Sequence, residues 1–385
     1  MENVVIVAAA RTAMGKANKG GLAASRPDEF GAAVAIELLK RVAPAVKPGD
    51  LEDVITGCAM PEGEQGLNVG RLISFLAGIP NHVAATTVNR FCGSSMSSIH
   101  YAAQGLMTGY GDVFMALGIE SMTKVPMGGF NPLPSKKLYE MMPEAYISMG
   151  ITAENLAKMY NISRLEQDEF AVASHLKAAK AIKEGLFKKE IIGYDTVDLN
   201  GNKIFFDTDD NVRANSSVEG LARLRPVFDK NGTVTAGSSS PLTDGAAGVI
   251  MMTEARAKLL GLKPLVRIKS MAVAGVAPEL MGLGPVAATK KALKRAGMEL
   301  SDIDFIELNE AFSAQSIAVI KEMNIDTSKL NMNGGAIALG HPLGASGARI
   351  VTTLINVLEQ QSGTVGLATM CIGGGQGTAT IIERI

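Results

Sequence analysis

The run Leu38-Leu39-Lys40-Arg41 is echoed late in the chain by Ala292-Leu293-Lys294-Arg295, and Asp53-Val54-Ile55 is echoed by Asp304-Phe305-Ile306. In both places the end of a predicted helix precedes a predicted strand, so the matches indicate an internal duplication. Two copies of one β/α unit would each carry a helix layer that needs cover, and stacking the copies buries the inner helices between two sheets. The repeat therefore predicts an α/β fold, a duplicated five-layer α-β-α-β-α sandwich.

The pattern of apolar residues gives both halves the same order of elements. In the first part we expect strands near 3–8, 53–58 and 112–118, and helices near 27–43, 67–78 and 93–108. In the last part we expect strands near 265–274, 304–308 and 364–371, and helices near 285–296, 311–322 and 344–358. The helices at 93–108 and 344–358 are counterparts, both rich in Gly, Ala and Ser, as closely packed central helices would be.

Residues 119–244 break this pattern and predict an inserted loop subdomain, which would act as a lid and hold a ligand. One helix inside it is clearly signalled, because Ser163 and Glu166 form a capping-box pattern and Gly185 closes the same helix. We therefore predict, besides the insertion, an N-terminal half at 1–118 completed by 245–262, and a C-terminal half at 263–385.

Composition narrows the class of protein. The 385 residues are too many for one small core, and 47% hydrophobic residues with 42 glycines and no tryptophan are typical of an α/β protein. A net charge of -1 and a pI near 6.5 give no basic footprint for nucleic acid.

The apolar runs, the N-terminal stretch and the cysteines of the sequence indicate where the protein is located in the cell. The chain has no apolar run of about 18 residues, so we expect no transmembrane segment. The stretch Met1–Val7 lacks a basic leader and is predicted to be the first strand. Three cysteines without close paired spacing, Cys58, Cys92 and Cys371, fit a reducing compartment and neither a disulfide framework nor a zinc site. We therefore expect a cytoplasmic protein without a metal.

Cys92 is the first candidate for chemistry. It lies in Val88-Asn89-Arg90-Phe91-Cys92-Gly93-Ser94-Ser95-Met96, where an extended segment stops at a small-residue turn and a helical pattern begins. Free amides and the helix dipole at such a position favour the nucleophilic thiolate. The alternative is an inert core residue, since free cysteine is among the most buried residue types.

Three further segments combine glycines with reactive side chains: Glu307-Leu308-Asn309-Glu310-Ala311-Phe312, Asn333–Gly344 and Met370–Gly377. Each is predicted at a strand end or a strand-to-helix turn, and such positions line the ligand crevice of an open α/β sheet. Taken alone, Asn309 could be the N-cap of the helix from Ala311, and His341 before Pro342 could fill a turn.

Other kinds of site are disfavoured by the same segments. His341-Pro342 stands where a P-loop needs Lys and Ser/Thr, so a nucleotide triphosphate site is improbable. The run Gly373–Gly377 lacks dinucleotide-binding spacing, and without a Gly-x-Ser-x-Gly elbow a serine hydrolase has no nucleophile.

Together these four segments resemble, in order, those of the thiolase family. The resemblance covers essentially the whole chain, because five more segments match: Met149–Glu154, Leu224–Phe228, Thr235–Gly237, Asp244–Ala247 and Met281–Val286. It implies the family's five-layer fold and a ping-pong acyltransferase that cleaves 3-ketoacyl-CoA with CoA. Coenzyme A and acyl-CoA would be substrates, with no permanently bound cofactor.

The resemblance also implies roles for the motif residues. Cys92 would be the nucleophile that forms an acyl thioester, and His341 would deprotonate it. His341, with a water held by Asn309, would support negative charge on the thioester oxygen, while Cys371 would protonate the acetyl-CoA carbanion. The amides of Cys92 and Gly373 would form an oxyanion hole. The CoA channel would be lined by Arg213, Ser240, Phe312, Met149 and Phe228.

Two departures bear on the type of thiolase. Short-chain members carry His-Met-Gly where this chain has Ser148-Met149-Gly150, which favours the 3-ketoacyl-CoA thiolases of bacterial fatty-acid β-oxidation. The alternative is a short-chain, biosynthetic acetoacetyl-CoA thiolase. At Ser238-Ser239-Ser240 only the last serine matches the family's Asn-Ala-Ser. Homodimers or homotetramers are expected, with a possible hydratase/dehydrogenase partner subunit.

Two functions other than a thiolase are also considered for this sequence. A decarboxylating ketoacyl synthase usually has histidine at the Asn309 position and another partner at Cys371, so these residues speak against it. A carrier that binds acyl-CoA without turnover would have lost one catalytic group, and all four are present.

Overall fold

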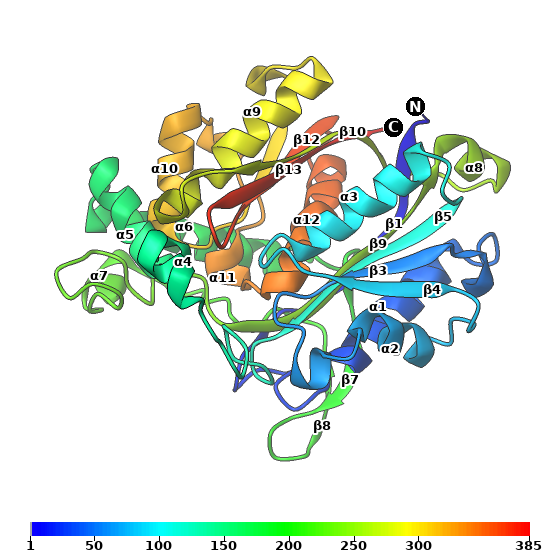
Figure 1. Ribbon diagram of the computed structural model, residues 1–385, viewed down its shortest axis with the longest axis horizontal. Helices are drawn as coiled ribbons and strands as arrows, with labels where there is room; N and C mark the ends of the chain where they lie inside the picture. The colour runs from blue at the N-terminus through cyan, green and yellow to red at the C-terminus, as the bar shows by residue number, and fades with distance from the viewer. Residues whose placement is uncertain (1) are drawn as a thin grey trace.

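Helix layers and sheet layers alternate through the molecule, and Figure 1 shows five of them from α9 at one side to α1 and α2 at the other. The computed structural model describes residues 2–385, so only Met1 lies outside it. The predicted five-layer fold is confirmed.

The first half of the sheet has the strand order β1-β9-β5-β3-β4. Its strands are β1 (Val4–Thr12), β9 (Thr243–Thr253), β5 (Val113–Ser121), β3 (Asp53–Gly57) and β4 (Ala84–Val88). β3 runs parallel to both β4 and β5, whereas β9 is antiparallel to β5 and to β1. A short strand, β2 (Gly15–Lys16), also pairs with β9.

The second half repeats this arrangement in the order β10-β13-β12-β11. Its strands are β10 (Val266–Gly275), β13 (Gln376–Arg384), β12 (Val365–Ile372) and β11 (Phe305–Leu308). β11 is parallel to β12, and the next two pairings are antiparallel, as in the first half. The duplication predicted from short sequence matches is therefore visible in the strand pairing.

The two sheet halves are also hydrogen-bonded to each other, which the sequence did not suggest. β1 pairs with β10 at Val5↔Arg267 and Ile6↔Val266, so the strands form one continuous 11-stranded sheet. The link covers the start of β1, whose backbone groups would otherwise form an open edge.

The central helix layer consists of α3 (Ser94–Met107) and α12 (Ser346–Gln360), which lie between the sheet halves. A Cβ added to Gly347 would lie 2.3 Å from the backbone N of Met96, and the amide of Ala348 donates to Ser95 Oγ at 2.9 Å. The prediction of closely packed central helices is thus confirmed. The outer layers contain α1 (Pro27–Val42) and α2 (Val69–Leu76) on one side, and α9 (Gly284–Ala296) and α10 (Ser313–Met323) on the other.

All twelve predicted elements of the two halves are present, and the largest difference in bounds is that β1 extends to Thr12. β9 and β13 were not predicted as strands, although both are almost entirely buried. Among residues 2–385, no helix is long and apolar enough to cross a membrane.

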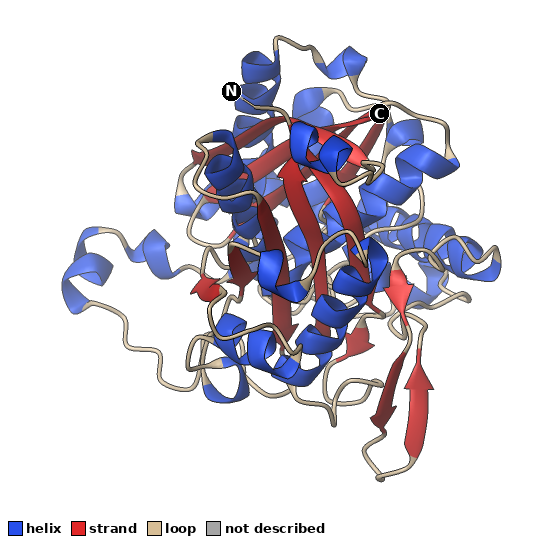
Figure 2. Ribbon diagram, turned by 90° about the vertical axis from the view of Figure 1, so that its right-hand side faces the viewer, coloured by secondary structure: helices blue, strands red, loops and turns tan. Residues whose placement is uncertain are grey.

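Between β5 and β9 the chain forms several small elements. They are α4 (Lys136–Met141), α5 (Met149–Met159), α6 (Arg164–Lys183), β6 (Ile191–Ile192), β7 (Tyr194–Val197), β8 (Lys203–Phe206) and α7 (Val218–Ala222). The predicted capping box is confirmed, because Glu166 N donates to Ser163 Oγ at 3.1 Å and Ser163 N donates to Glu166 Oε2 at 2.7 Å. Figure 2 shows the β7–β8 hairpin projecting from the body.

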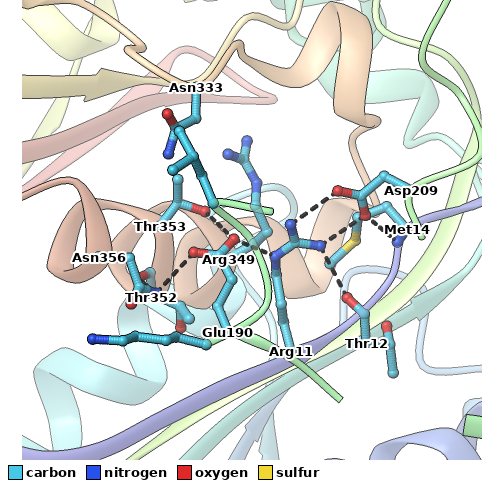
Figure 3. A network of polar contacts seen from close by, with 12 residues as sticks. Arg11, Thr12, Met14, Glu190, Asp209, Asn333, Arg349, Thr352, Thr353 and Asn356 are labelled. Atoms are coloured by element: carbon cyan, nitrogen blue, oxygen red, sulfur yellow. Dashed lines mark hydrogen bonds and ion pairs between the residues drawn. The ribbon is translucent and has the colours of Figure 1, made fainter. Parts of the chain in front are cut away.

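A buried ionic network ties this segment to both halves (Figure 3). The guanidinium of Arg11 on β1 donates to Asp209 at 2.7 and 2.9 Å and to Glu190 at 2.6 Å. Glu190 also accepts from Thr353 and Asn356 of α12. Buried charges are tolerated only when paired and hydrogen-bonded, so this network fixes the segment in one position.

Candidate active site

The turn that carries Cys92 connects β4 to α3. Phe91 adopts a positive φ of 43°, which is uncommon for a residue with a side chain and is held by a bond from its amide to Asn89 Oδ1 at 2.8 Å. Ser94 Oγ donates to Phe91 O at 2.6 Å, and α3 begins at Ser94 with Gly93 as its N-cap. The thiol therefore lies just before the helix, as predicted.

Cys92 is also buried, with 3% of its surface exposed. Burial raises the pKa of its thiol to about 11, while hydrogen bonds from the amides of Gly373 and Cys92 itself lower it and the charge of Glu120 raises it. We expected the helix start to favour thiolate. That expectation is wrong for the free protein, because the cost of burying an anion exceeds the benefit of the amides.

Cys371 lies near the end of β12 and approaches Cys92 from the other half of the molecule. Burial raises the pKa of Cys371, and the charge of Cys92 raises it further, so the two thiols are near enough to influence each other. The segments pack tightly here, because a Cβ on Gly93 would lie 2.4 Å from Ile372 Cδ1. Gly373 follows in the turn to β13, and its amide reaches Cys92.

Two hydrogen bonds, one from the backbone and one at the ring, hold His341 in place. Its backbone amide donates to Thr243 Oγ1 at 3.1 Å, and its Nδ1 lies 2.6 Å from Ser346 Oγ. The single hydroxyl proton of Ser346 is donated to Pro342 O at 2.9 Å, so this oxygen accepts from Nδ1. We therefore assign the ring proton to Nδ1, which leaves the lone pair of Nε2 free to act as a base.

Burial lowers the pKa of His341 to about 3, and the charge of Arg349 lowers it further. The imidazole is therefore neutral near pH 7. Nε2 lies 3.4 Å from Asn309 Nδ2, so the side-chain amide of Asn309 points at the basic nitrogen.

Asn309 is not a helix cap, because α10 begins only at Ser313. Its backbone amide donates to Thr369 O of β12 at 3.0 Å, which extends the pairing of β11 by one residue. The N-cap alternative left open by the sequence is therefore wrong.

The chain resembles proteins of a known family along nearly its whole length. Two family models match it, the thiolase N-terminal domain at residues 4–255 and the thiolase C-terminal domain at residues 262–384. The chain belongs to the thiolase family.

Relatives of this thiolase chain support the assignment. It is 52% identical to a 3-ketoacyl-CoA thiolase of Marinomonas sp. (strain MWYL1), covering 100% of the chain and 98% of the relative. A 3-ketoacyl-CoA thiolase of Bacillus subtilis is 50% identical, with both chains covered completely. The crystal structure of the Bacillus anthracis acetyl-CoA acetyltransferase superposes with a TM-score of 0.92 at 39% identity, covering 100% of this chain and 99% of the other.

Three of the residues predicted to line a CoA channel lie around a fourth, Phe312, in this thiolase. Phe228 and Phe312 meet edge to face with ring centroids 5.8 Å apart, and Met149 packs against the cluster that contains Phe312 and Cys371. The amide of Ser240 donates to Ala311 O at 3.0 Å, which places this serine next to Phe312.

Arg213 is connected to this group through Ser239, which forms a bridge with Phe312. The amide of Arg213 donates to His175 Nδ1 at 3.2 Å, and the residue lines a shallow depression that also includes Gly237 and Ser239. In residues 2–385, no three histidine, cysteine or carboxylate side chains are grouped so that they could hold a metal ion.

Sequence reasoning missed two residues that support the thiolase site. Ser346 orients the ring of His341. The only signal for Ser346 in the sequence is its position four residues after Pro342. Glu120, at the end of β5, accepts from the amides of Ala59 and Gly344, both at 2.8 Å. A carboxylate ending an apolar strand was the available signal for Glu120, which joins the two halves beside Cys92.

Proposed function

We propose that the chain catalyses the CoA-dependent cleavage of 3-ketoacyl-CoA to acetyl-CoA and a shortened acyl-CoA in fatty-acid β-oxidation. The observation that carries this proposal is that two buried free cysteines, Cys92 and Cys371, lie on neighbouring segments of the two halves. Cys92 lies at a strained turn with amide donors around its sulfur. One thiol can hold an acyl group while the other carries a proton, which is the division of labour that ping-pong acyl transfer needs.

Cys92 is the proposed nucleophile and His341 its base. Both groups are neutral at rest, so Nε2 takes the thiol proton as sulfur attacks the C3 ketone of the substrate. The alkoxide that forms is stabilised by the amides of Cys92 and Gly373, the same amides that lower the thiol pKa in the free protein.

Cys371 is the proposed acid. When the alkoxide collapses, the C2–C3 bond breaks and its electron pair moves to C2 of the departing acetyl-CoA. The Cys371 thiol gives its proton to C2, while His341 and Asn309, with a water between them and the substrate, stabilise charge on the thioester oxygen. Incoming CoA then returns a proton to Cys371, and its sulfur attacks the acyl group on Cys92. The Cys92 thiolate that leaves takes back its proton from His341.

Met149, Phe228 and Phe312 would form the apolar wall of the pantetheine channel, with Ser240 offering a polar contact beside it. Arg213 is suited to the phosphate end of CoA. We propose that CoA and acyl-CoA are the only small molecules required, as substrates, and that no cofactor is permanently bound.

The main alternative is a short-chain acetoacetyl-CoA thiolase. Ser148, where short-chain members carry histidine, favours the β-oxidation type, and relatives named 3-ketoacyl-CoA thiolase are half identical over the full length. The test is CoA-dependent loss of enolate absorbance with 3-ketoacyl-CoA of increasing length. We expect turnover of long chains; activity confined to acetoacetyl-CoA would favour the alternative.

We also propose an organisation for the whole protein. The N-terminal half would be 1–118 completed by 245–262, since β9 lies between β1 and β5, with the insertion at 119–244 and the C-terminal half at 263–385. The strand at the sheet end, β4, has one free edge on which a second copy could pair in a homodimer. We further propose a homotetramer as the alternative assembly, which measurement of the size in solution would test. A hydratase/dehydrogenase partner subunit would be tested by pull-down, and a cytoplasmic location by cell fractionation.

A further inference from the structure

Asn331 binds both backbone groups of the residue before Asn309. Its Oδ1 accepts from Leu308 N at 2.9 Å, and its Nδ2 donates to Leu308 O at 2.9 Å. Its own amide donates to Ile306 O at 2.9 Å. The side-chain amide therefore takes the place of a neighbouring strand residue and holds the end of β11 in extended form up to Asn309.

The same Nδ2 continues the chain of contacts toward His341. It donates to Glu310 Oε1 at 2.7 Å, and Glu310 Oε2 accepts from Ile337 N at 3.2 Å. Ile337 lies in α11 (Ala336–Leu339), which ends two residues before His341. Glu310, the residue after Asn309, is thus hydrogen-bonded to the helix that leads into the catalytic histidine. Asn331 links Glu310 to Leu308, the residue before Asn309.

This linkage has little room to relax. Asn331 and Glu310 are both 2% exposed, and a Cβ added to Gly335 would lie 2.1 Å from Glu310 Cδ. Ser174 of α6 closes the other side, because its Oγ donates to Glu310 Oε2 at 2.6 Å and accepts from Gly335 N at 3.0 Å. A shift of the Glu310 carboxylate would break bonds to the inserted segment and to the turn before α11 together.

The first half contains a related contact. Asn89, which follows β4, donates from Nδ2 to Ala59 O at 2.9 Å, just beyond the end of β3. Leu330, the residue before Asn331, forms a parallel bridge with Ile306 of β11 just as β4 pairs with β3. An asparagine thus supports the strand end at corresponding places in both halves, near Cys92 in one and near Asn309 in the other.

We propose that Asn331 and Glu310 are positioning residues that set the distance and orientation of Asn309 relative to the Nε2 atom of His341. They do not touch substrate; they act through Asn309 and His341, so the proposal rests on the catalytic roles proposed above. A misplacement of about 1 Å in such a pair can cost roughly a hundredfold in rate.

The test compares Asn331→Asp with Asn333→Asp. Aspartate at 331 keeps the acceptor for Leu308 N but replaces the donor by a carboxylate oxygen facing Leu308 O and Glu310. Asn333 is the matched control, because it is equally buried and donates to Gln360 Oε1 at 2.9 Å, at the end of α12. We expect Asn331→Asp to lower kcat for thiolysis about 10- to 100-fold with little change in KM for CoA. Asn333→Asp should lower the melting temperature but leave kcat within about twofold.

A reciprocal exchange adds a rescue that a merely structural role would not give. In Glu310→Gln alone, the new side-chain NH2 group faces Asn331 Nδ2, so two donors meet. In the double variant, the NH2 group of glutamine at 310 can donate to the carboxylate of aspartate at 331, which restores one hydrogen bond between the two side chains. We expect the double variant to exceed the product of the single effects by about fivefold or more. If Asn331→Asp does not fold, Glu310→Gln takes its place. We then expect the kcat of Glu310→Gln to fall below that of the control Asn333→Asp.

Equal kcat in Asn331→Asp and Asn333→Asp, or no gain in the double variant, would overturn the proposal. A crystal structure of Asn331→Asp adds a readout that does not depend on catalysis. We expect the separation of Asn309 Nδ2 and His341 Nε2 to increase from 3.4 Å. An unchanged separation overturns the positioning role, whereas wild-type protein without thiolysis overturns the proposed function itself.

Discussion

Nδ1 of His341 lies 2.6 Å from Ser346 Oγ, and this hydroxyl donates at 2.9 Å to Pro342 O. These two contacts, and the side-chain amide of Asn309 that faces Nε2, favour the tautomer of the neutral ring with its proton on Nδ1 and its lone pair on Nε2. A base buried this deeply cannot exchange tautomers through water, so the serine determines whether the ring can accept a proton from Cys92.

Replacing Ser346 by alanine should therefore lower kcat about tenfold, because the ring loses the acceptor that fixes its tautomer. Initial rates of thiolysis at saturating substrate measure the effect. Ser74→Ala is the matched control, since Ser74 is equally buried and donates to the carbonyl four residues earlier, Gly70 O at 2.9 Å, far from the site. Similar kcat values in the two variants would show that Ser346 has no special role.

The close approach of Gly93 to Ile372 predicts that a single methyl group disturbs the pair of cysteines. In Gly93→Ala the new Cβ would meet Ile372 Cδ1 at 2.4 Å, although the backbone of Gly93, with φ -88°, suits alanine. We expect kcat to fall about tenfold as the segments that carry Cys92 and Cys371 are pushed apart. Adding Ile372→Val, which removes Cδ1, should recover part of this loss, and the absence of any recovery would argue against the steric cause.

The pKa of about 11 for Cys92 predicts how the free protein reacts with iodoacetamide. Because thiolate is the reactive form, the alkylation rate at Cys92 should be low at pH 7 and rise about tenfold per pH unit toward pH 11. Peptide-resolved mass spectrometry follows this residue separately from Cys58 and Cys371, with Cys92→Ser as a blank. A rate that levels off near pH 8 would mean that the amides outweigh burial.

The buried pairing of Arg11 with Asp209 and Glu190 predicts a large loss of stability in Arg11→Met. Removing the cation leaves two buried carboxylates without a counterion, which costs about 3–5 kcal/mol of unfolding free energy. Arg26→Met is the control, because the Arg26–Asp28 ion pair has its guanidinium 47% exposed and should cost about 1 kcal/mol or less. Urea unfolding measures both, and equal losses would contradict a structural role for the network.

The sequence could predict the duplicated architecture because β1, β3 and the helices around them carry their own local patterns. β9 and β13 escaped prediction because both are buried on two faces, so their residues do not alternate between apolar and polar. β9 also contains Gly245 and Gly248, which lower its apparent strand propensity.

Some residues of the candidate site could likewise be predicted from the sequence, and others could not. Cys92, His341, Asn309 and Cys371 were found through motifs, whereas Ser346, Glu120 and Asn331 act through hydrogen bonds that no local pattern encodes. Gly344, which donates to Glu120, is 224 residues away in the chain. The expectation of a thiolate at Cys92 failed for a related reason, since burial comes from tertiary packing and not from the turn itself.

The division of labour between the two cysteines is tested most directly by mass spectrometry of peptides after the protein is mixed with a 3-ketoacyl-CoA in the absence of added CoA. The acyl group should be found on the peptide that contains Cys92, with Cys371 unmodified. An acyl group on Cys371 alone would contradict the mechanism proposed for this chain.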